Sequence, residues 1–332
     1  MRRARAPHRP LPRGGRRPRP GALLAGVLAA LALGGCGLAI GNAPSAVQLL
    51  VTSEFGGTLV RRSGALKAHE GETVRSLLAS LLPVRGGADG HPVASIGGLA
   101  AGGSGSEPGQ PREWFYFVNG VQIEKAPSRR EVHPGDHIWW DLHDASQTRV
   151  PRAVVGAYPQ PFLDGTEGKR LPVRVECASV SAAPCTTVTE SLRRVGVPAA
   201  VAAIGSGGAP ETLRVMVGPW VYLAGDLEAQ SIAHGPRESG VYVRIPASGG
   251  QLTLLDEQGR AVRSLSGDAG LVAATTATKE APVWVITGTD EAGVELAAGA
   301  LNATALADHF ALALTPRGAV ALPVQGGAGA RR

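Results

Sequence analysis

The residues best suited to contact a ligand gather in one short stretch, residues 112–144, which reads REWFYFVNGVQIEKAPSRREVHPGDHIWWDLHD. It holds six of the chain's fourteen aromatic residues, including three of the five tryptophans, and three of the eight histidines. Large rings with a polar edge suit stacking on a planar ligand, a sugar or a protein partner. These residue types indicate a packed core, a ligand platform or a metal site.

Strand periodicity divides the stretch between two sheet faces, because successive side chains point to opposite sides. On the last strand one face carries Ile138, Trp140 and Leu142, and the other carries His137, Trp139, Asp141 and His143. If Phe115 and Phe117 point into the core, Trp114 and Tyr116 lie on the outer face with Trp139.

Exposed apolar patches tend to mark contact sites. We therefore expect a ligand-binding surface that consists of Trp114, Tyr116, Trp139 and His137. The alternative is that a second domain covers this face, and the sequence leaves both interpretations open.

The histidines of the stretch fit a metal site poorly. His137 and His143 lie six residues apart, which is about 20 Å along an extended strand. One ion cannot contact both side chains, so we expect no metal. A solvated polar face or a histidine enclosed near Trp139 explains the pattern better.

The N-terminal residues predict export and lipid attachment. Residues 1–20 carry eight arginines and no acid, and Ala22 to Leu33 is an apolar run that only Gly26 interrupts. A basic segment, a short apolar segment and small residues form a secretory signal. The sequence Leu33-Gly34-Gly35-Cys36 resembles a bacterial lipobox, in which the thiol of Cys36 receives a diacylglycerol. An ordinary signal peptide with an incidental cysteine is the alternative.

Removal of this signal reverses the net charge. The whole chain carries 33 basic and 27 acidic residues, and without the eight N-terminal arginines 25 basic residues remain. The mature chain is then slightly acidic, so the high pI is no argument for nucleic-acid binding. A lipid anchor would hold the protein at a membrane surface, on the extracytoplasmic side.

Two further cysteines, Cys177 and Cys185, are separated by seven residues. An exported protein is in a compartment that permits disulfides, so we expect a disulfide between them. The spacing is not Cys-x-x-Cys, which makes a redox or metal pair less suitable. A pair of reduced, buried thiols is the alternative.

Composition divides the chain into a signal (residues 1–35), a tether (36–45), a first domain (46–145), a linker (146–169), a second domain (170–323) and a disordered tail (324–332). In the first domain a hairpin at Gly56-Gly57 precedes a leucine-striped helix, which Thr73 caps and Pro83 ends. Further strands follow, with a turn at Asn119-Gly120. This order predicts an α+β fold with one helix across a mixed sheet.

The helix ETVRSLL, the strand WFYFVNGV and the later V-x-PGD-x-I-W resemble the transcobalamin-like C-terminal domain family over residues 46–145. The resemblance implies a β-grasp fold and small-ligand or surface binding. In animal cobalamin carriers such a domain closes over the corrinoid against an α/α-barrel. This chain has no such barrel, and only Trp114 matches a ligand-side position.

Residues 170–323 predict an α/β or α+β second domain with strand–helix–strand order at both ends, including one long helix over about 290–307. No nucleophile elbow, zinc-protease motif or phosphate loop is present in the sequence. Asp226, Glu228, Asp256 and Glu257 are interpreted as ordinary turn acids. These residues give no reason to expect an enzyme.

Three functions follow in order of preference. The first is a lipid-anchored extracytoplasmic binding protein that captures a corrinoid (a cobalamin) or another cofactor for a membrane importer, one of the energy-coupling-factor type. The second is an envelope protein–protein adaptor, or surface-assembly protein, without a small-molecule ligand. The third is an extracytoplasmic enzyme with its site between the domains.

Overall fold

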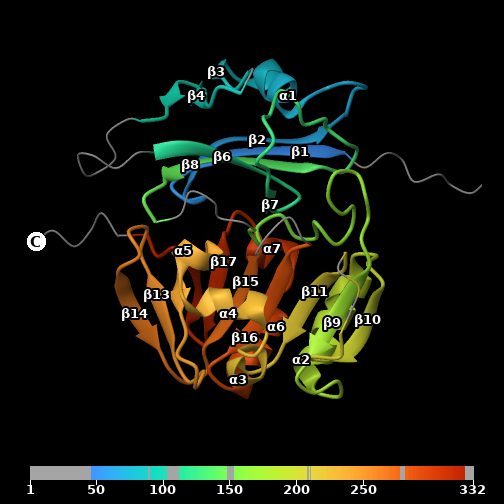
Figure 1. Cartoon of the computed structure of the whole chain (residues 1–332), viewed down its shortest axis with the longest axis vertical. Coiled ribbons are helices and arrows are strands. Elements are labelled where there is room, and N and C mark those ends of the chain that lie inside the picture. Colours follow the sequence, from blue (N-terminus) through green and yellow to red (C-terminus); the bar gives the residue numbers. More distant parts are fainter. Residues whose placement is uncertain are drawn as a thin grey trace, which may run out of the picture. The chain divides into compact units, whose positions relative to one another are not determined.

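The computed structural model describes residues 46–88, 90–102, 112–147, 153–207, 209, 211–276 and 281–325 (Figure 1). These residues all belong to one compact unit, residues 44–332. The predicted lipidation site, Cys36, lies outside the described residues, as does the predicted signal. None of the described helices is long and apolar enough to cross a membrane.

The first sheet has five strands in the order β2-β1-β8-β6-β7. Its strands are β1 (Val47–Ser53), β2 (Thr58–Leu66), β6 (Arg112–Val118), β7 (Val121–Gln122) and β8 (His137–Asp144). The central pair, β1 and β8, is parallel, and hairpins flank it on both sides. The sheet is therefore mixed, as predicted.

Helix α1 (Val74–Leu81) lies across one face of this sheet (Figure 1). Thr73 and Ser76 form a reciprocal capping box at its start, and the chain leaves the helix at Leu82, before Pro83. Its buried side chains, Val74, Leu77 and Leu78, pack in one core with Ile138 and Trp140 of β8. The predicted helix, its cap and its core face are confirmed.

A small sheet follows α1. It consists of β3 (Val84–Gly86), β4 (Val93–Ile96) and β5 (Leu99–Ala100).

The second large sheet has seven strands in the order β10-β9-β11-β16-β15-β17-β18. Its strands are β9 (Val173–Cys177), β10 (Ala199–Ala203), β11 (Leu213–Val217), β15 (Gly270–Thr275), β16 (Val283–Gly288), β17 (Ala311–Thr315) and β18 (Gly318–Leu322). The four strands from β10 to β16 are parallel, and the other three join them antiparallel. Together with the first sheet this confirms the α+β class.

One face of this sheet packs against α2 (Ala183–Arg194) and α6 (Glu291–Gly299). Asp290 caps α6 by accepting the N–H of Gly293 at 2.8 Å. The single long helix predicted over 290–307 is wrong, because the chain breaks at Ala300 and Leu301 and restarts as α7 (Ala303–Leu306) with Asn302 as its own cap.

The connection from β11 to β15 contains three short helices and a further sheet. The helices are α3 (Trp220–Leu223), α4 (Leu227–Ala233) and α5 (Pro236–Ser239). The sheet consists of β12 (Val243–Arg244), β13 (Leu252–Leu255) and β14 (Ala261–Leu265), and the predicted turn at Glu257-Gln258-Gly259 joins its last two strands.

The described part of the predicted linker, residues 153–169, is largely buried. Val154 joins the core beneath the first sheet, whereas Val155, Tyr158 and Phe162 join the core beneath α2 and α6. Val154 N–H also donates to Gly120 O at 2.8 Å, and Val155 N–H donates to Phe310 O at 3.1 Å. The segment therefore connects the two large sheets by packing and by backbone hydrogen bonds.

Cys177 and Cys185 form a disulfide between the end of β9 and the first turn of α2. Both residues are buried. The predicted pairing is confirmed.

Candidate functional site

The open aromatic surface predicted from the sequence is not present, because its central residue is enclosed. Trp139 is 0% exposed. Its indole Nε1 donates to Thr52 Oγ1 at 2.7 Å, and its ring meets the ring of Phe310 edge-on at 5.0 Å. A Cβ added at Gly156 would lie 2.9 Å from the Trp139 ring. The predicted face is thus covered by Phe310 of the predicted second domain and by Gly156 of the predicted linker.

Tyr116 and Trp114 lie on the opposite face of the sheet from Trp139, so the predicted grouping of the three is wrong. In the β6–β8 pair Phe117 stands opposite Trp139 and Tyr116 stands opposite Trp140, and directly opposed residues share a face. Tyr116 stacks on Trp140 at 4.8 Å, and burial raises its pKa. Trp114 is half-buried against the core under α1.

His137 is held at the edge of the same region by its backbone. Its N–H donates to Asn119 Oδ1 at 2.8 Å, within the turn that the sequence predicted. Burial lowers the pKa of the imidazole to about 4, against the opposing effect of Asp308 and with a further contribution from Arg62. The ring is neutral near pH 7 and shares no open surface with the three aromatic residues.

A buried polar network replaces the predicted surface. Asp141 is fully buried and accepts hydrogen bonds from Thr52 Oγ1 at 2.5 Å, Phe55 N at 3.0 Å and Gly56 N at 2.9 Å. His143 Nδ1 lies 2.7 Å from Asp141 Oδ1, the oxygen that also accepts the Phe55 N–H. The network ties the β1–β2 turn to β8.

The His143 ring is also enclosed by aromatic side chains. It stacks between Phe55 and Phe115, with ring centroids 4.2 Å from each, and Phe310 approaches its edge at 5.4 Å. A histidine enclosed near Trp139 was one of the predicted alternatives, and His143 fulfils it. Both faces of the His143 ring are covered, so the Asp141–His143 pair has no open surface in this structure and acts within the core.

Carboxylates surround Glu257 in the turn between β13 and β14. Burial raises the pKa of Glu257 to about 7, and the charges of Glu54, Asp144, Asp141 and Asp256 act in the same direction. The protonated form of the Glu257 side chain is therefore favoured in the folded state.

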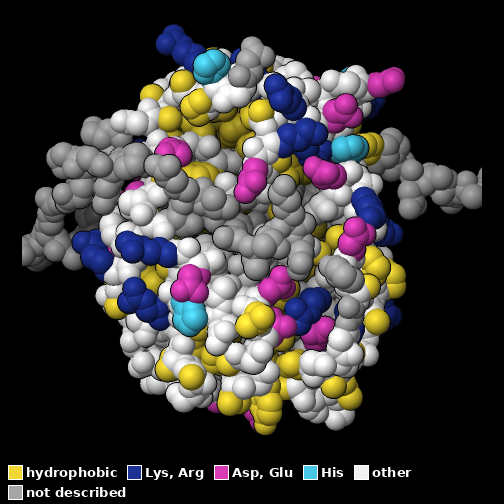
Figure 2. Space-filling view, in the orientation of Figure 1, with side chains coloured by type: hydrophobic (Ala, Val, Ile, Leu, Met, Phe, Trp, Pro, Cys, Tyr) yellow, Lys and Arg dark blue, Asp and Glu magenta, His cyan; other side chains and the backbone are white. Residues whose placement is uncertain are grey.

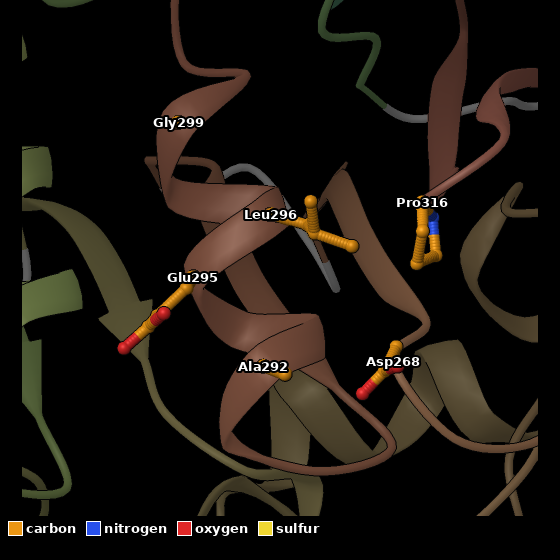
Figure 3. Close-up of a pocket in the computed structure, with 6 residues that line it drawn as sticks. All are labelled: Asp268, Ala292, Glu295, Leu296, Gly299 and Pro316. Carbon is orange, nitrogen blue, oxygen red and sulfur yellow. The ribbon is translucent and has the colours of Figure 1, made fainter.

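One surface cavity lies beside α6. Leu296 points across it toward Pro316, with Asp268 below, whereas Glu295 points away from this gap (Figure 3). The lining contains two acidic residues, Asp268 and Glu295, and otherwise small apolar surfaces. It provides few groups that could orient a ligand.

A second cavity, of about 500 Å³, carries ionisable groups of both signs. We call it the charged cavity. Its ionisable lining residues are Arg174, Glu176, Arg214, Asp226 and Glu228. Figure 2 shows acidic and basic side chains gathered over β11, in the orientation of Figure 1. Gly205, Gly207 and Thr212, from the loop between β10 and β11, complete one wall.

Arg214 is the centre of the charged cavity. Its Nη2 lies 2.8 Å from Glu176 Oε2 and 2.5 Å from Asp226 Oδ2, and its Nη1 lies 3.6 Å from Glu228 Oε2. Burial acts to lower the pKa of Arg214, but the hydrogen bonds to Glu176 and Asp226 outweigh it and hold the pKa above its ordinary value. Arg214 therefore stays charged and fixes the carboxylates around it.

Arg174 is less fully paired. Its Nε lies 3.4 Å from Glu176 Oε1 without the alignment of a hydrogen bond, so this buried N–H has no hydrogen-bond partner among the described residues. Buried polar groups are normally satisfied. Arg174 Nε is such a group without a hydrogen-bond partner in the described part of the chain, whereas Nη2 of the same guanidinium donates to Ser206 Oγ. The Arg174 side chain is 14% exposed and lines the cavity.

Local structure explains why these residues meet. Arg174 and Arg214 stand opposite each other on the parallel strands β9 and β11. They alternate with Val175 and Val215, which face the core under α2, so the charged side chains share the other face. Asp226 is brought to them as the N-cap of α4.

This site was not predicted from the sequence, where Asp226 and Glu228 were interpreted as ordinary turn acids. A signal for it was present in VRVEC, where Arg174 and Glu176 alternate with valines, and in LRVMV, where Arg214 is the one charged residue. Parallel sheets usually bury both faces and read as continuous apolar runs. Charges at every second position of such a strand therefore indicate a polar face, and in this structure Glu176 on that face is buried beside Arg174 and Arg214.

The wall of the charged cavity carries charged groups of both signs and the hydroxyl of Thr212. Its lining residues include no cysteine, histidine or serine among those the structure describes. Two guanidinium groups and three carboxylates can instead orient a ligand that carries both charges.

Comparison with known proteins places a family match outside this cavity. A family model described as a domain of unknown function (DUF4430) matches residues 71–144, from just before α1 to the end of β8. None of the curated proteins matches the chain. Residues 71–144 are thus similar to this family, whereas β9, β11 and α4, which form the charged cavity, lie beyond the match.

Proposed function

We propose that the protein is a lipid-anchored extracytoplasmic binding protein that holds a small charged ligand in the charged cavity. The observation that carries this proposal is the set of fixed charges of both signs in the wall of a cavity of about 500 Å³. Cavities that bind small molecules in proteins measure about 300–1,000 Å³ and contain a few placed polar groups.

The anchor and the location rest on the sequence. The basic and apolar segments before Cys36 and the Leu-Gly-Gly motif support export and acylation. The disulfide between Cys177 and Cys185 agrees with an oxidising compartment.

The ligand that we propose is a zwitterion of amino-acid or short-peptide size. A carboxylate would engage Arg174, and an ammonium group would lie near Asp226 and Glu228. The corrinoid that the family resemblance suggested would need a wide apolar platform, and Trp139 and Tyr116 are buried. Transfer to an importer of the energy-coupling-factor type remains the proposed purpose of capture.

In this proposal the first domain, residues 46–145, is the base on which the second domain packs. We infer that residues 46–145 adopt a β-grasp fold, because the parallel pair β1–β8 has the antiparallel neighbours β2 and β6 and one helix crosses the sheet. The face without α1 packs into the core that contains Phe310 and Trp220.

Calorimetric titration of the purified protein tests the proposal. The panel contains single amino acids, dipeptides and cobalamin. We expect Arg174→Ala to weaken binding of a zwitterion about 10- to 100-fold, since a hydrogen bond to a charged group contributes about 1.5–3 kcal/mol. The matched control is Arg193→Ala, which removes an exposed arginine from α2 and should leave affinity unchanged.

Two results would overturn the assignment. Binding of a zwitterion that is equal in wild type and Arg174→Ala places the ligand elsewhere. Tight binding of cobalamin that is unaffected by Arg174→Ala restores the corrinoid and removes the charged cavity from the function.

A second candidate, the protein–protein adaptor, is favoured by one exposed apolar group. Leu227, Tyr222 and Val221, on α3 and α4, are 83%, 60% and 58% exposed. Exposed apolar residues that gather on a surface mark contact sites. Crosslinking in intact envelopes that is lost in a Tyr222→Glu, Leu227→Glu variant, together with no binding in the ligand panel, would favour this function.

A further inference from the structure

Strand β10 is an unprotected edge of the seven-stranded sheet. Its sequence is Ala199-Ala200-Val201-Ala202-Ala203, and it pairs only with β9, in an unbroken parallel register. Val201 is 45% exposed. Ala203 O, at the end of the strand, accepts hydrogen bonds from Ser206 N at 3.2 Å and Ser206 Oγ at 2.6 Å. The backbone groups of Val201 have no partner beyond β9 among the described residues, so the centre of the edge can pair with another strand.

Proteins usually protect such edges with charges, proline or a bulge. The edge strand of the first sheet, β2, follows this rule, because it carries Arg61 and Arg62 and its pairing with β1 is interrupted by register shifts. Strand β10 has none of these features between its ends. The contrast within one chain suggests that the β10 edge is kept free for a partner.

We propose that β10 pairs antiparallel with β10 of a second copy of this chain, across a two-fold axis at Val201. The strand is a palindrome, so the axis places Ala199 opposite Ala203 of the partner and Ala200 opposite Ala202. A two-fold interface must be self-complementary, and this register sets equal, small side chains against each other without like charges. The two seven-stranded sheets then form one continuous sheet.

The flanking charges agree with this register. On the polar face Ala200 lies beside Arg174 and Ala202 lies beside Glu176. The two-fold pairing therefore puts Arg174 of one copy in the same cross-strand row as the partner's Glu176. The two strands that carry them are about 14 Å apart, at three spacings of ~4.8 Å, and only alanine side chains lie between them.

The other face supplies the apolar contact. Ala199 packs against the core under α2, and Val201 lies on this same face by strand alternation. Helix α2 leaves Val201 exposed, and the antiparallel pair buries it against Val201 of the second copy. Because Pro198 ends the ladder at one side, the interface is short and reversible, and a shared membrane surface would strengthen it.

Cysteine crosslinking tests the register in a Cys36→Ser background, which removes the third cysteine together with the proposed site of lipid attachment. Val201→Cys should form an intermolecular disulfide, because residues that face each other lie about 4.5–5.5 Å apart between Cα atoms. Ala199→Cys alone should not, since its two copies lie about 14 Å apart along the strand. A mixture of Ala199→Cys and Ala203→Cys should crosslink.

Sedimentation equilibrium over a range of concentrations gives an independent readout. We expect Val201→Lys to weaken dimerisation at least 10-fold without change in the far-ultraviolet spectrum. The matched control is Val262→Lys, on β14, where the valine is 52% exposed and dimerisation should be unchanged. A wild type that stays monomeric, or crosslinking of Ala199→Cys as efficient as that of Val201→Cys, overturns the proposal.

Discussion

Replacement of Asp141 by alanine should destabilise the protein strongly. The carboxylate accepts hydrogen bonds from two backbone N–H groups, those of Phe55 and Gly56, and from Thr52, and it pairs with His143. The alanine variant leaves these groups buried and unpaired. Removal of one partner from a buried charged network costs about 3–5 kcal/mol, so we expect a loss of about 4 kcal/mol in the free energy of unfolding.

The asparagine variant separates the loss of charge from the loss of shape. Asp141→Asn keeps one acceptor oxygen for the Phe55 N–H and His143, but its amide group meets the N–H of Gly56, and both are donors. An unsatisfied buried donor costs about 1–3 kcal/mol. We therefore expect the order wild type, Asn variant, Ala variant in decreasing stability.

Urea unfolding at pH 7, followed by tryptophan fluorescence, measures these differences. Glu295→Ala is the control, because this exposed acid on α6 should change stability by less than about 0.5 kcal/mol. A loss below about 1 kcal/mol for Asp141→Ala would refute the reasoning, since it would show that the carboxylate does not hold the β1–β2 turn to β8.

Three other perturbations have defined outcomes. Burial raises the pKa of Glu257 from its ordinary 4.5 to about 7, so its protonated form is favoured in the folded state, and stability should fall as pH rises from 4.5 through 7. Solvent screens this partly exposed group, so we expect the loss to be about 1 kcal/mol. In urea unfolding at pH 5 and pH 8, Glu257→Gln should remove this difference, and an unchanged difference would assign it to another group. Phe310→Ala opens a cavity against Trp139 and His143 and should cost about 3–5 kcal/mol, with a red shift of tryptophan emission; emission that stays at the wild-type wavelength would contradict the packing. Replacement of both Cys177 and Cys185 by alanine opens a loop with a sequence separation of 8 and should cost about 2–3 kcal/mol, a loss that a reductant should reproduce in the wild type.

Local sequence patterns predicted much of the first domain. The stripe of Val74, Leu77 and Leu78, the cap at Thr73 and the Asn119-Gly120 turn all depend on neighbours within a few residues. Such features follow from backbone geometry and periodicity. The α+β class and the disulfide were predictable for the same reason, since both depend on element order and spacing.

The residues of β6 alone did not predict which of its side chains face α1. Its sequence, REWFYFV, carries large rings at both parities, so alternation alone does not decide which ring faces α1. The register with β8 decides it, by setting Tyr116 opposite Trp140. Register depends on contacts between segments about twenty residues apart, which a pattern within one strand does not contain. The charged cavity was not predicted for a related reason. Helix α3 lies between Arg214 and Asp226 in the sequence, and the two residues meet only in the folded chain.

Strands β8 and β9 both carry polar residues at alternate positions, but only β9 lines the charged cavity. A strand whose face is solvated carries polar residues at every second position, whereas a strand covered on both faces carries apolar residues at both parities. Strand β9 alternates valine with Arg174 and Glu176, and these two residues line the charged cavity. Strand β8 departs from the rule, because Asp141 and His143 occupy alternate positions and are nevertheless buried. Polar residues at every second position therefore indicate either a solvated face or a buried polar network, and packing between distant segments decides which of the two forms.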